Sequence, residues 1–226
     1  MGGVGTVGTC GVDRELGEQL VGREIGIGLA ALTDAPEGAE LLTRTSRPFR
    51  LPEETEEAEE IIDQLHRTIR RVRDHHHFGK GMGLAAQIGI DRAAAIVLPP
   101  NPDASAVVLL NPTIISESGT TDSQYEGCLS FFDVRGLVPR PRRIEVEHTR
   151  PDGSTAITVF TDALARLVAH EVDHLHGMTY KVRMDEGVSP IPVEEYRGSG
   201  RSWSLRPRHR INVSVGVTPE EGVGAC

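Results

Sequence analysis

Two short stretches of the chain carry residues that together could hold a metal ion and activate water. His170, Glu171 and His174 form an H-E-x-x-H run, and on a helix its two histidines project from the same face, one turn apart. Cys128, in the run Glu126–Ser130 (EGCLS), supplies a thiolate-capable side chain. Two imidazoles and a thiolate leave one metal position open for water, as a catalytic site requires. The sequence therefore predicts a metal-hydrolase site, with Glu171 placed to handle the proton of that water.

The H-E-x-x-H run lies at the end of a segment with the signals of a helix. Thr161 is a typical N-cap residue and Gly177 stands where a C-terminal cap belongs, so a helix is predicted over residues 162–176. H-E-x-x-H alone is a short pattern, and a salt-bridged helix surface is the competing interpretation. The apolar Val172 and Leu175 favour a half-buried histidine face. The predicted apolar face comprises Leu164, Leu167, Val168 and Leu175.

The other predicted elements give the fold class. A longer helix is predicted over residues 52–76, where apolar residues recur at helical spacing between an acidic start and an arginine-rich end. A glycine-rich turn over 81–83 follows. Strands and a central helix then predict an α+β fold, with mixed or antiparallel sheets around the helix that carries H-E-x-x-H. The predicted strands cover residues 93–98, 106–110, 143–148 and 156–160, with a hairpin turn at Pro151-Asp152-Gly153 between the last two.

The order of these segments predicts three parts of the chain. Residues 39–186 form the catalytic domain. Residues 1–38 form a glycine-rich N-terminal extension, in which glycines weaken a helix over 14–32. Residues 187–226 form a C-terminal tail without helical period, rich in Pro, Gly, Ser and Arg, with one short strand expected over 211–217.

The composition excludes several classes of function. The net charge of −9 over 226 residues argues against a general nucleic-acid binder, because phosphate binding needs clustered positive charge. The 3 cysteines are scattered and form no disulfide framework, which suits a reducing compartment. The sequence contains no signal peptide and no apolar run of the ~18 residues typical of a membrane-spanning helix. We therefore expect a cytoplasmic protein with neither DNA nor membrane as a partner.

Four stretches taken together resemble the peptide deformylase family. The run Gly81–Ala86 (GMGLAA), the EGCLS run and the run His170–Gly177 (HEVDHLHG) are similar to that family's three motifs, in the family's order and spacing. The stretch Arg135–Pro141 (RGLVPRP) is also similar to it. The resemblance covers residues 41–185 and leaves out both ends of the chain. Three ordered motifs are far more specific than H-E-x-x-H alone.

The resemblance implies a metal-dependent amide hydrolase that removes the formyl group from N-formylmethionyl peptides and nascent chains. Cys128, His170 and His174 would hold one divalent ion, with ferrous iron as the first choice and zinc or nickel as alternatives. The ion would lower the pKa of bound water and polarise the formyl oxygen. Glu171 would carry the proton, and the backbone N–H of Leu129 would donate to the oxyanion. Substrate contacts would come from Met82, Gly83, Gly127 and Leu167.

One departure from the family's pattern concerns Gln87. The family's first motif reads G-x-G-L-A-A-x-Q, whereas Gln87 follows Ala86 directly here. In the family this glutamine's amide helps to polarise the formyl oxygen, and a one-residue deletion in an extended segment turns later side chains to the opposite face. Either a shorter loop still brings Gln87 to the site, or the oxyanion loses a donor, at a typical cost of ~10²–10³ in rate. Under the hypothesis of a weakened enzyme, inserting a proline between these two residues should raise kcat/KM for formyl-Met peptides. High wild-type activity without a gain would contradict it.

The sequence leaves some alternatives open. One is a weakly active or inactive paralogue that acts on or binds another N-formyl substrate or an inhibitor, although the intact Glu171 speaks against inactivity. Asp173 either orients a ligand histidine or is a solvated helix carboxylate. The arginine-rich segment 197–210 either contacts ribosomal RNA transiently or is a solvated tail.

Overall fold

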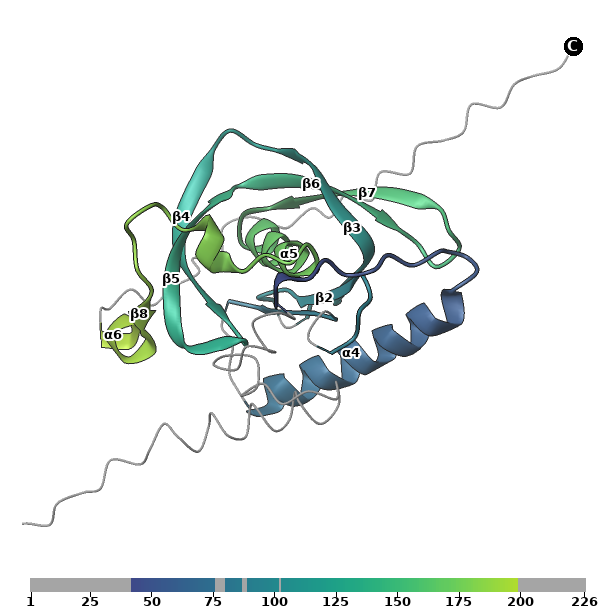
Figure 1. Ribbon diagram of the computed structural model, residues 1–226, viewed down its shortest axis with the longest axis horizontal. Coiled ribbons are helices and arrows are strands. Elements are labelled where there is room, and N and C mark those ends of the chain that lie inside the picture. Colours follow the sequence, from purple (N-terminus) through teal and green to yellow (C-terminus); the bar gives the residue numbers. More distant parts are fainter. Residues whose placement is uncertain (1–41, 76–79, 87–88, 102, 199–226) are drawn as a thin grey trace, which may run out of the picture.

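The computed structural model describes residues 42–75, 80–86, 89–101 and 103–198. They form an α+β fold in which two antiparallel sheets surround one helix, α5 (Asp162–Leu175) (Figure 1). The fold class expected from the sequence is confirmed. Gln87, the extension 1–38 with its weak helical segment, and the strand expected over 211–217 lie outside the described residues.

Helix α4 (Thr55–His75) packs along β1 and β2 of the larger sheet (Figure 1). Leu65, Ile69 and Val72 are buried at spacings of three and four residues, so they form one apolar stripe that faces the sheet. Acidic residues occupy the first turn, where they complement the helix dipole. The helix predicted over 52–76 is confirmed, and it begins later than expected because residues 51–54 form a turn.

The larger sheet has five antiparallel strands in the order β1-β2-β3-β6-β7. Strand β2, the second in this order, is buried over Ala94–Val97, because α4 packs against it and α5 also contacts it. This two-sided burial explains its apolar sequence without alternation. The hairpin predicted between the last two strands is confirmed, and Gly153 takes the left-handed φ of 85° that its turn needs. The strands are β1 (Met82–Ala85), β2 (Ala94–Leu98), β3 (Val107–Glu117), β6 (Arg143–Thr149) and β7 (Thr155–Thr161).

The smaller sheet is a long hairpin with a short third strand. Strands β4 (Thr121–Cys128) and β5 (Phe131–Pro141) pair from Thr121 opposite Pro141 to Cys128 opposite Phe131. The register shifts between Glu126 and Cys128, so an irregularity lies beside the predicted cysteine ligand. Strand β8 (Ile191–Pro192) pairs with β5 at its other edge.

Helix α5 lies inside the curve of the two sheets (Figure 1) and contacts strands from both. Leu164, Val168 and Val172 are buried in one cluster with apolar side chains of the larger sheet. Thr161 occupies the N-cap position as predicted, but its side chain makes no capping hydrogen bond. Asp162 instead accepts hydrogen bonds from the guanidinium of Arg142, which ties the helix start to the end of β5.

Three local expectations are corrected. The glycine turn expected over 81–83 is confined to Gly81, with φ 84°, because Gly83 lies in β1. The strand expected over 106–110 continues to Glu117, and β4 and β5 were not expected at all. The segment after Gly187 was expected to lack helix, but it forms β8 and the short helix α6 (Val193–Gly198). A 3-10 turn, η1 (Tyr180–Arg183), precedes this segment. Within the part of the chain that the structure describes, no helix is long and apolar enough to span a membrane.

Candidate metal centre and active site

The last turns of α5 place His170, Glu171 and His174 in the interior. Their exposed fractions are 8%, 5% and 7%, so the histidine face is more deeply buried than the sequence suggested. The helix ends in a Schellman arrangement, in which Met178 N–H donates to Asp173 O (2.9 Å) and Gly177 N–H to His174 O (3.0 Å). Gly177 has a φ of 71°, which glycine adopts without strain, so the predicted C-terminal cap is confirmed.

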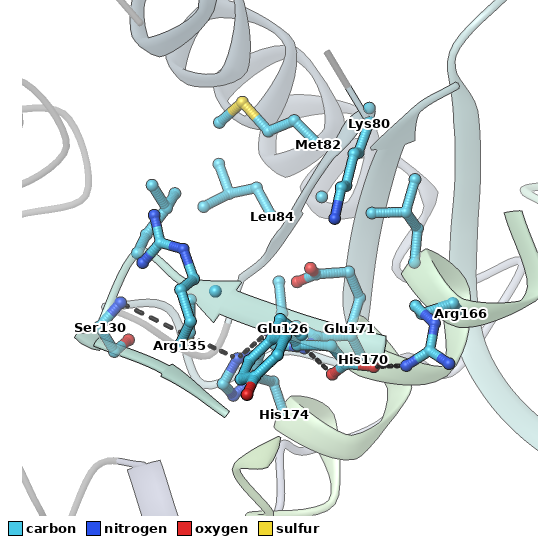
Figure 2. A pocket seen from close by; sticks show the side chains of 18 of the residues that line it. Lys80, Met82, Leu84, Glu126, Ser130, Arg135, Arg166, His170, Glu171 and His174 are labelled. Carbon is cyan, nitrogen blue, oxygen red and sulfur yellow. Dashed lines mark hydrogen bonds and ion pairs between the residues drawn. The ribbon is translucent and has the colours of Figure 1, made fainter. Parts of the chain in front are cut away.

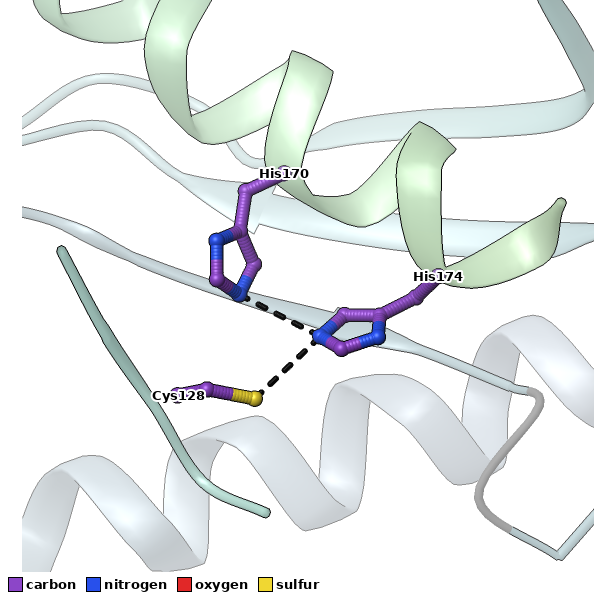
Figure 3. A group of neighbouring side chains, drawn as sticks. All are labelled: Cys128, His170 and His174. Carbon is purple, nitrogen blue, oxygen red and sulfur yellow. Dashed lines mark hydrogen bonds between the residues drawn. The ribbon is translucent and has the colours of Figure 1, made fainter. Parts of the chain in front are cut away.

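The end of β4 brings Cys128 to the two histidines (Figure 3). The Cys128 Sγ lies 3.2 Å from His174 Nε2, and that nitrogen lies 3.2 Å from His170 Nε2. The donor atoms of the three side chains all lie within 4.8 Å of one another. Strand β4 and helix α5, which strands β5, β6 and β7 separate in the sequence, thus bring their donor atoms together at one point.

Glu126 fixes the orientation of one of these rings. Its Oε2 accepts a hydrogen bond from His170 Nδ1 at 3.0 Å, so in the neutral ring the lone pair lies on the other nitrogen, Nε2, which points to Cys128 and His174. A divalent metal ion fits this donor set, because one thiolate and two imidazole lone pairs facing one another are the ligands of a three-residue catalytic centre.

The surroundings of Cys128 also favour the thiolate form of its side chain. Burial raises its pKa, but the opposing effect of the two histidines, His174 first, holds the pKa well below its usual range. The backbone N–H of Ser130 donates to Sγ at 3.4 Å and adds to this stabilisation. A thiolate is the form of cysteine that binds a metal.

Beneath the three donor residues lies a network of buried ion pairs. The Arg140 guanidinium donates to Glu126 through Nε and Nη2, both at 3.0 Å, and to Asp173 through Nη1 at 2.5 Å. Arg166 reaches Glu126 at 2.6 Å, and Arg183 reaches Asp173 at 2.6 Å. Burial would raise the pKa of Glu126, but hydrogen bonds from His170 and Arg140 hold it well below its usual range.

This network corrects both interpretations of Asp173. The residue is 2% exposed, so it is no solvated carboxylate. It does not orient a histidine directly either, because within the described residues its carboxylate accepts hydrogen bonds from Arg140 and Arg183. The carboxylate that orients a histidine is Glu126, which sequence reasoning missed. Its one signal was its place at the start of the EGCLS run, because no strand was expected there and the register shifts between Glu126 and Cys128.

The carboxylate of Glu171 lies against the backbone of β1. A Cβ added to Gly83 would lie only 2.3 Å from Glu171 Oε1, so glycine is required there for the carboxylate to occupy its position. Burial raises the pKa of Glu171, although His170 and His174 oppose the shift. A carboxyl group whose pKa is raised toward neutrality is suited to taking up and returning a proton.

These groups open into a cavity of about 320 Å³ (Figure 2). The structure brings every described site residue of the sequence prediction to this cavity or to the metal-binding cluster; Gln87 lies outside the described residues. Sequence reasoning missed further lining residues, and of these only Arg135 lies in a stretch that the sequence analysis singled out, Arg135–Pro141. They include Leu42, Lys80, Tyr125, Arg135, Arg166 and Tyr196, the last from α6. The predicted residues at the cavity are Met82, Gly83, Gly127, Cys128, Leu129, Leu167, His170, Glu171 and His174.

An H-E-x-x-H helix with a cysteine as third donor, enclosed by antiparallel sheets, defines a class of metal-dependent hydrolases. The family model for polypeptide deformylase matches residues 35–189. The chain belongs to the polypeptide deformylase family, and it is therefore an enzyme of the peptide deformylase type.

Curated relatives and solved structures agree with this assignment. Peptide deformylase 2 of Pseudomonas putida is 39% identical over 161 residues, which are 66% of this chain and 85% of that protein. Peptide deformylase 2 of Nostoc sp. is 33% identical over 147 residues, 62% of this chain and 78% of that protein. A class I type b peptide deformylase of Acinetobacter baumannii, solved with Met-Ala-Ser bound, superposes with a TM-score of 0.55 at 32% identity, covering 64% of this chain and 92% of that one.

Proposed function

We propose that this site hydrolyses the formyl amide of N-formylmethionyl peptides, with Cys128, His170 and His174 as metal ligands and Glu171 as the proton carrier. The observation that carries the proposal is the convergence of the three donor atoms within 4.8 Å at the wall of a cavity that Glu171 also lines. When bound, a divalent ion supplies Lewis acidity, which makes water nucleophilic near neutral pH and polarises a carbonyl.

Residues around the metal centre have further roles in the proposed reaction. Glu171 accepts the proton of the attacking water and returns it to the leaving amine, a role that its raised pKa supports. The backbone N–H of Leu129, next to the ligand Cys128, donates to the developing oxyanion. Glu126 holds the ring of His170 in the orientation that the metal needs. We predict that the side-chain amide of Gln87 is a second donor to the oxyanion; Gln87 lies outside the described residues.

The apolar part of the cavity suits the methionine side chain of the substrate. Met82 is buried at the start of β1, and Leu167 projects from α5 into the same cavity. Gly83 and Gly127 also line the cavity, and the space beside them is occupied by the side chains of Glu171 and Arg135. We propose these four residues as the contacts of the formyl-methionine.

The metal we propose first is ferrous iron, with zinc or nickel as alternatives. A set of one thiolate and two imidazoles accepts several divalent ions, so availability decides among them. Metal analysis of anaerobically purified protein tests this, with Cys128→Ser as the variant expected to lose metal. Equal metal content in that variant would exclude Cys128 as a ligand.

The cellular setting follows from the substrate. A cytoplasmic location suits an enzyme that acts on nascent chains and needs Cys128 reduced. A transient ribosome contact through the arginine-rich segment 197–210 stays a prediction, because residues from 199 onward lie outside the described part of the chain. The division into parts 1–38, 39–186 and 187–226 is likewise a proposal. Since Tyr196 lines the cavity, we propose that the catalytic unit extends past residue 186 and includes Tyr196.

The decisive experiment is an anaerobic assay of the iron-loaded protein on formyl-Met-Ala-Ser. Glu171→Ala is expected to lower kcat by at least ~10²-fold while metal content stays unchanged, because it removes the proton carrier and no ligand. Glu145→Ala, on the exterior of β6, is the matched control and is expected to keep full activity. Tight binding of the peptide without turnover in the unaltered protein would instead favour an inactive binder.

A further inference from the structure

Helix α4 lies on the outside of the fold and presents charged side chains away from the core (Figure 1). Leu65, at the middle of the helix, is 1% exposed and marks the direction of the core. In an α-helix successive residues are about 100° apart, so four exposed central residues lie within about 40° of the opposite direction. They are Glu60, Asp63, Arg67 and Arg70. Among the described residues, no member of α4 lines the cavity, so this face is separate from the active site.

The charges on this face are separated by sign along the helix axis. Glu60 and Asp63 precede the midpoint of α4, and Arg67 and Arg70 follow it. The helix dipole does not explain this order, because its effect is confined to the first and last turns and all four residues lie further inside. Contacts within the helix do not explain it either, since Glu59 and Asp63 stand four residues apart with like charges, which is unfavourable.

The same face is complementary to a second copy of itself in the antiparallel orientation. A two-fold axis near Leu65 places the acidic half of one helix opposite the arginine half of the other. The lateral positions also match, because Glu60 and Arg67 lie on one side of the face, whereas Asp63 and Arg70 lie on the other. Two-fold symmetry forms each of these two pairs twice. A parallel arrangement would instead bring like charges together.

We propose that α4 is the interface of a homodimer in which two copies pack antiparallel through this charged face. The large hydrophobic side chains that are exposed in the described part of the chain lie outside α4, so charge complementarity sets the orientation. The dimer is weak and depends on protein concentration, because exposed ion pairs individually contribute little. Asp74 limits the interface, since it would face Glu56 of the second copy. The inference concerns assembly and does not depend on the proposed function.

The test uses the full-length protein and two variants whose α4 face carries a single sign of charge. Glu60→Arg with Asp63→Arg makes the face positive, and Arg67→Glu with Arg70→Glu makes it negative. Sedimentation velocity of the unaltered protein is expected to show a rising dimer fraction up to about 1 mM, the range of weak complexes. Each variant alone is expected to dimerise at least about tenfold more weakly. An equal mixture of the two variants is expected to form the heterodimer.

Two further variants separate this interface from a general effect of charge. Glu117→Arg with Glu147→Arg makes the same change in net charge at exposed positions of β3 and β6, and it is expected to leave dimerisation unchanged. Asp74→Arg supplies a partner for Glu56 of the second copy, and it is expected to strengthen the dimer at least about threefold. A monomer at every concentration of the unaltered protein, or a mixture of the single-sign variants that associates no more than either alone, would overturn the proposal.

Discussion

Replacing Arg140 by methionine is expected to destabilise the protein by about 3–5 kcal/mol, because breaking a buried ion pair leaves an uncompensated buried charge. Arg140 is 3% exposed and donates to both Glu126 and Asp173, which are themselves buried. Methionine replaces the aliphatic part of the arginine side chain but not the guanidinium, so it removes the ion pairs and leaves the space of that group unfilled, which adds to the cost. Glu126 and Asp173 keep other arginine partners, which places the expected loss at the lower end of this range.

The matched control is Arg183→Met. Arg183 also pairs with Asp173, but its side chain is 40% exposed, so its removal is expected to cost about 1 kcal/mol or less. Urea denaturation of the metal-free protein, followed by circular dichroism, gives both values, and melting should shift by roughly 6–20 °C for Arg140→Met. If the two variants lose equal stability, burial of an ion pair does not determine how much it contributes to the free energy of unfolding, and the reasoning is refuted.

Three further perturbations follow from the described contacts. Gly83→Ala is expected to reduce kcat by at least ~10²-fold without loss of metal, because its Cβ would displace the Glu171 carboxylate; unchanged kcat would show that the carboxylate acts from elsewhere. The backbone N–H of Arg50 is the main cause that lowers the pKa of Glu54 to about 2, so this group stabilises the fold above pH 4.5 and loses the effect as pH falls toward 2. Glu54→Gln should therefore flatten the acid limb of a stability–pH curve, and an unaltered limb would contradict this. Removing the metal with a chelator should lower the melting temperature by roughly 5–11 °C at metal concentrations near a hundred times Kd, and a constant melting temperature would argue against tight binding by the folded state.

The sequence predicted the parts of the fold that depend on local periodicity. The stripe of α4, the caps of α5 and the turn at Gly153 are each set by residues close together in the chain, and all three lie as expected. The pairing of β4 with β5 was missed because one run, TDSQYEGC, is mostly polar and has no alternation that marks a strand. Its burial depends on α5, which no local pattern in β4 reveals.

The same distinction applies to the site. Cys128, His170 and Glu171 were found because their residue types and order are diagnostic of a chemistry. Glu126 has the same type as many surface acids, and its contact with His170 arises only when β4 docks on α5. Tyr196 lies in a segment of low periodicity, and its place at the cavity results from the pairing of β8 with β5.

The cavity wall combines residues that are far apart in the sequence, since Leu42 and Tyr196 both line it. During synthesis, residues emerge in order, so the three metal donors are available once α5 has left the ribosome, whereas α6 follows later. A nascent chain of this protein can therefore assemble its metal-binding cluster before its substrate cavity is complete. In this order of synthesis, Tyr196 of α6 joins the cavity wall after the metal donors have been made.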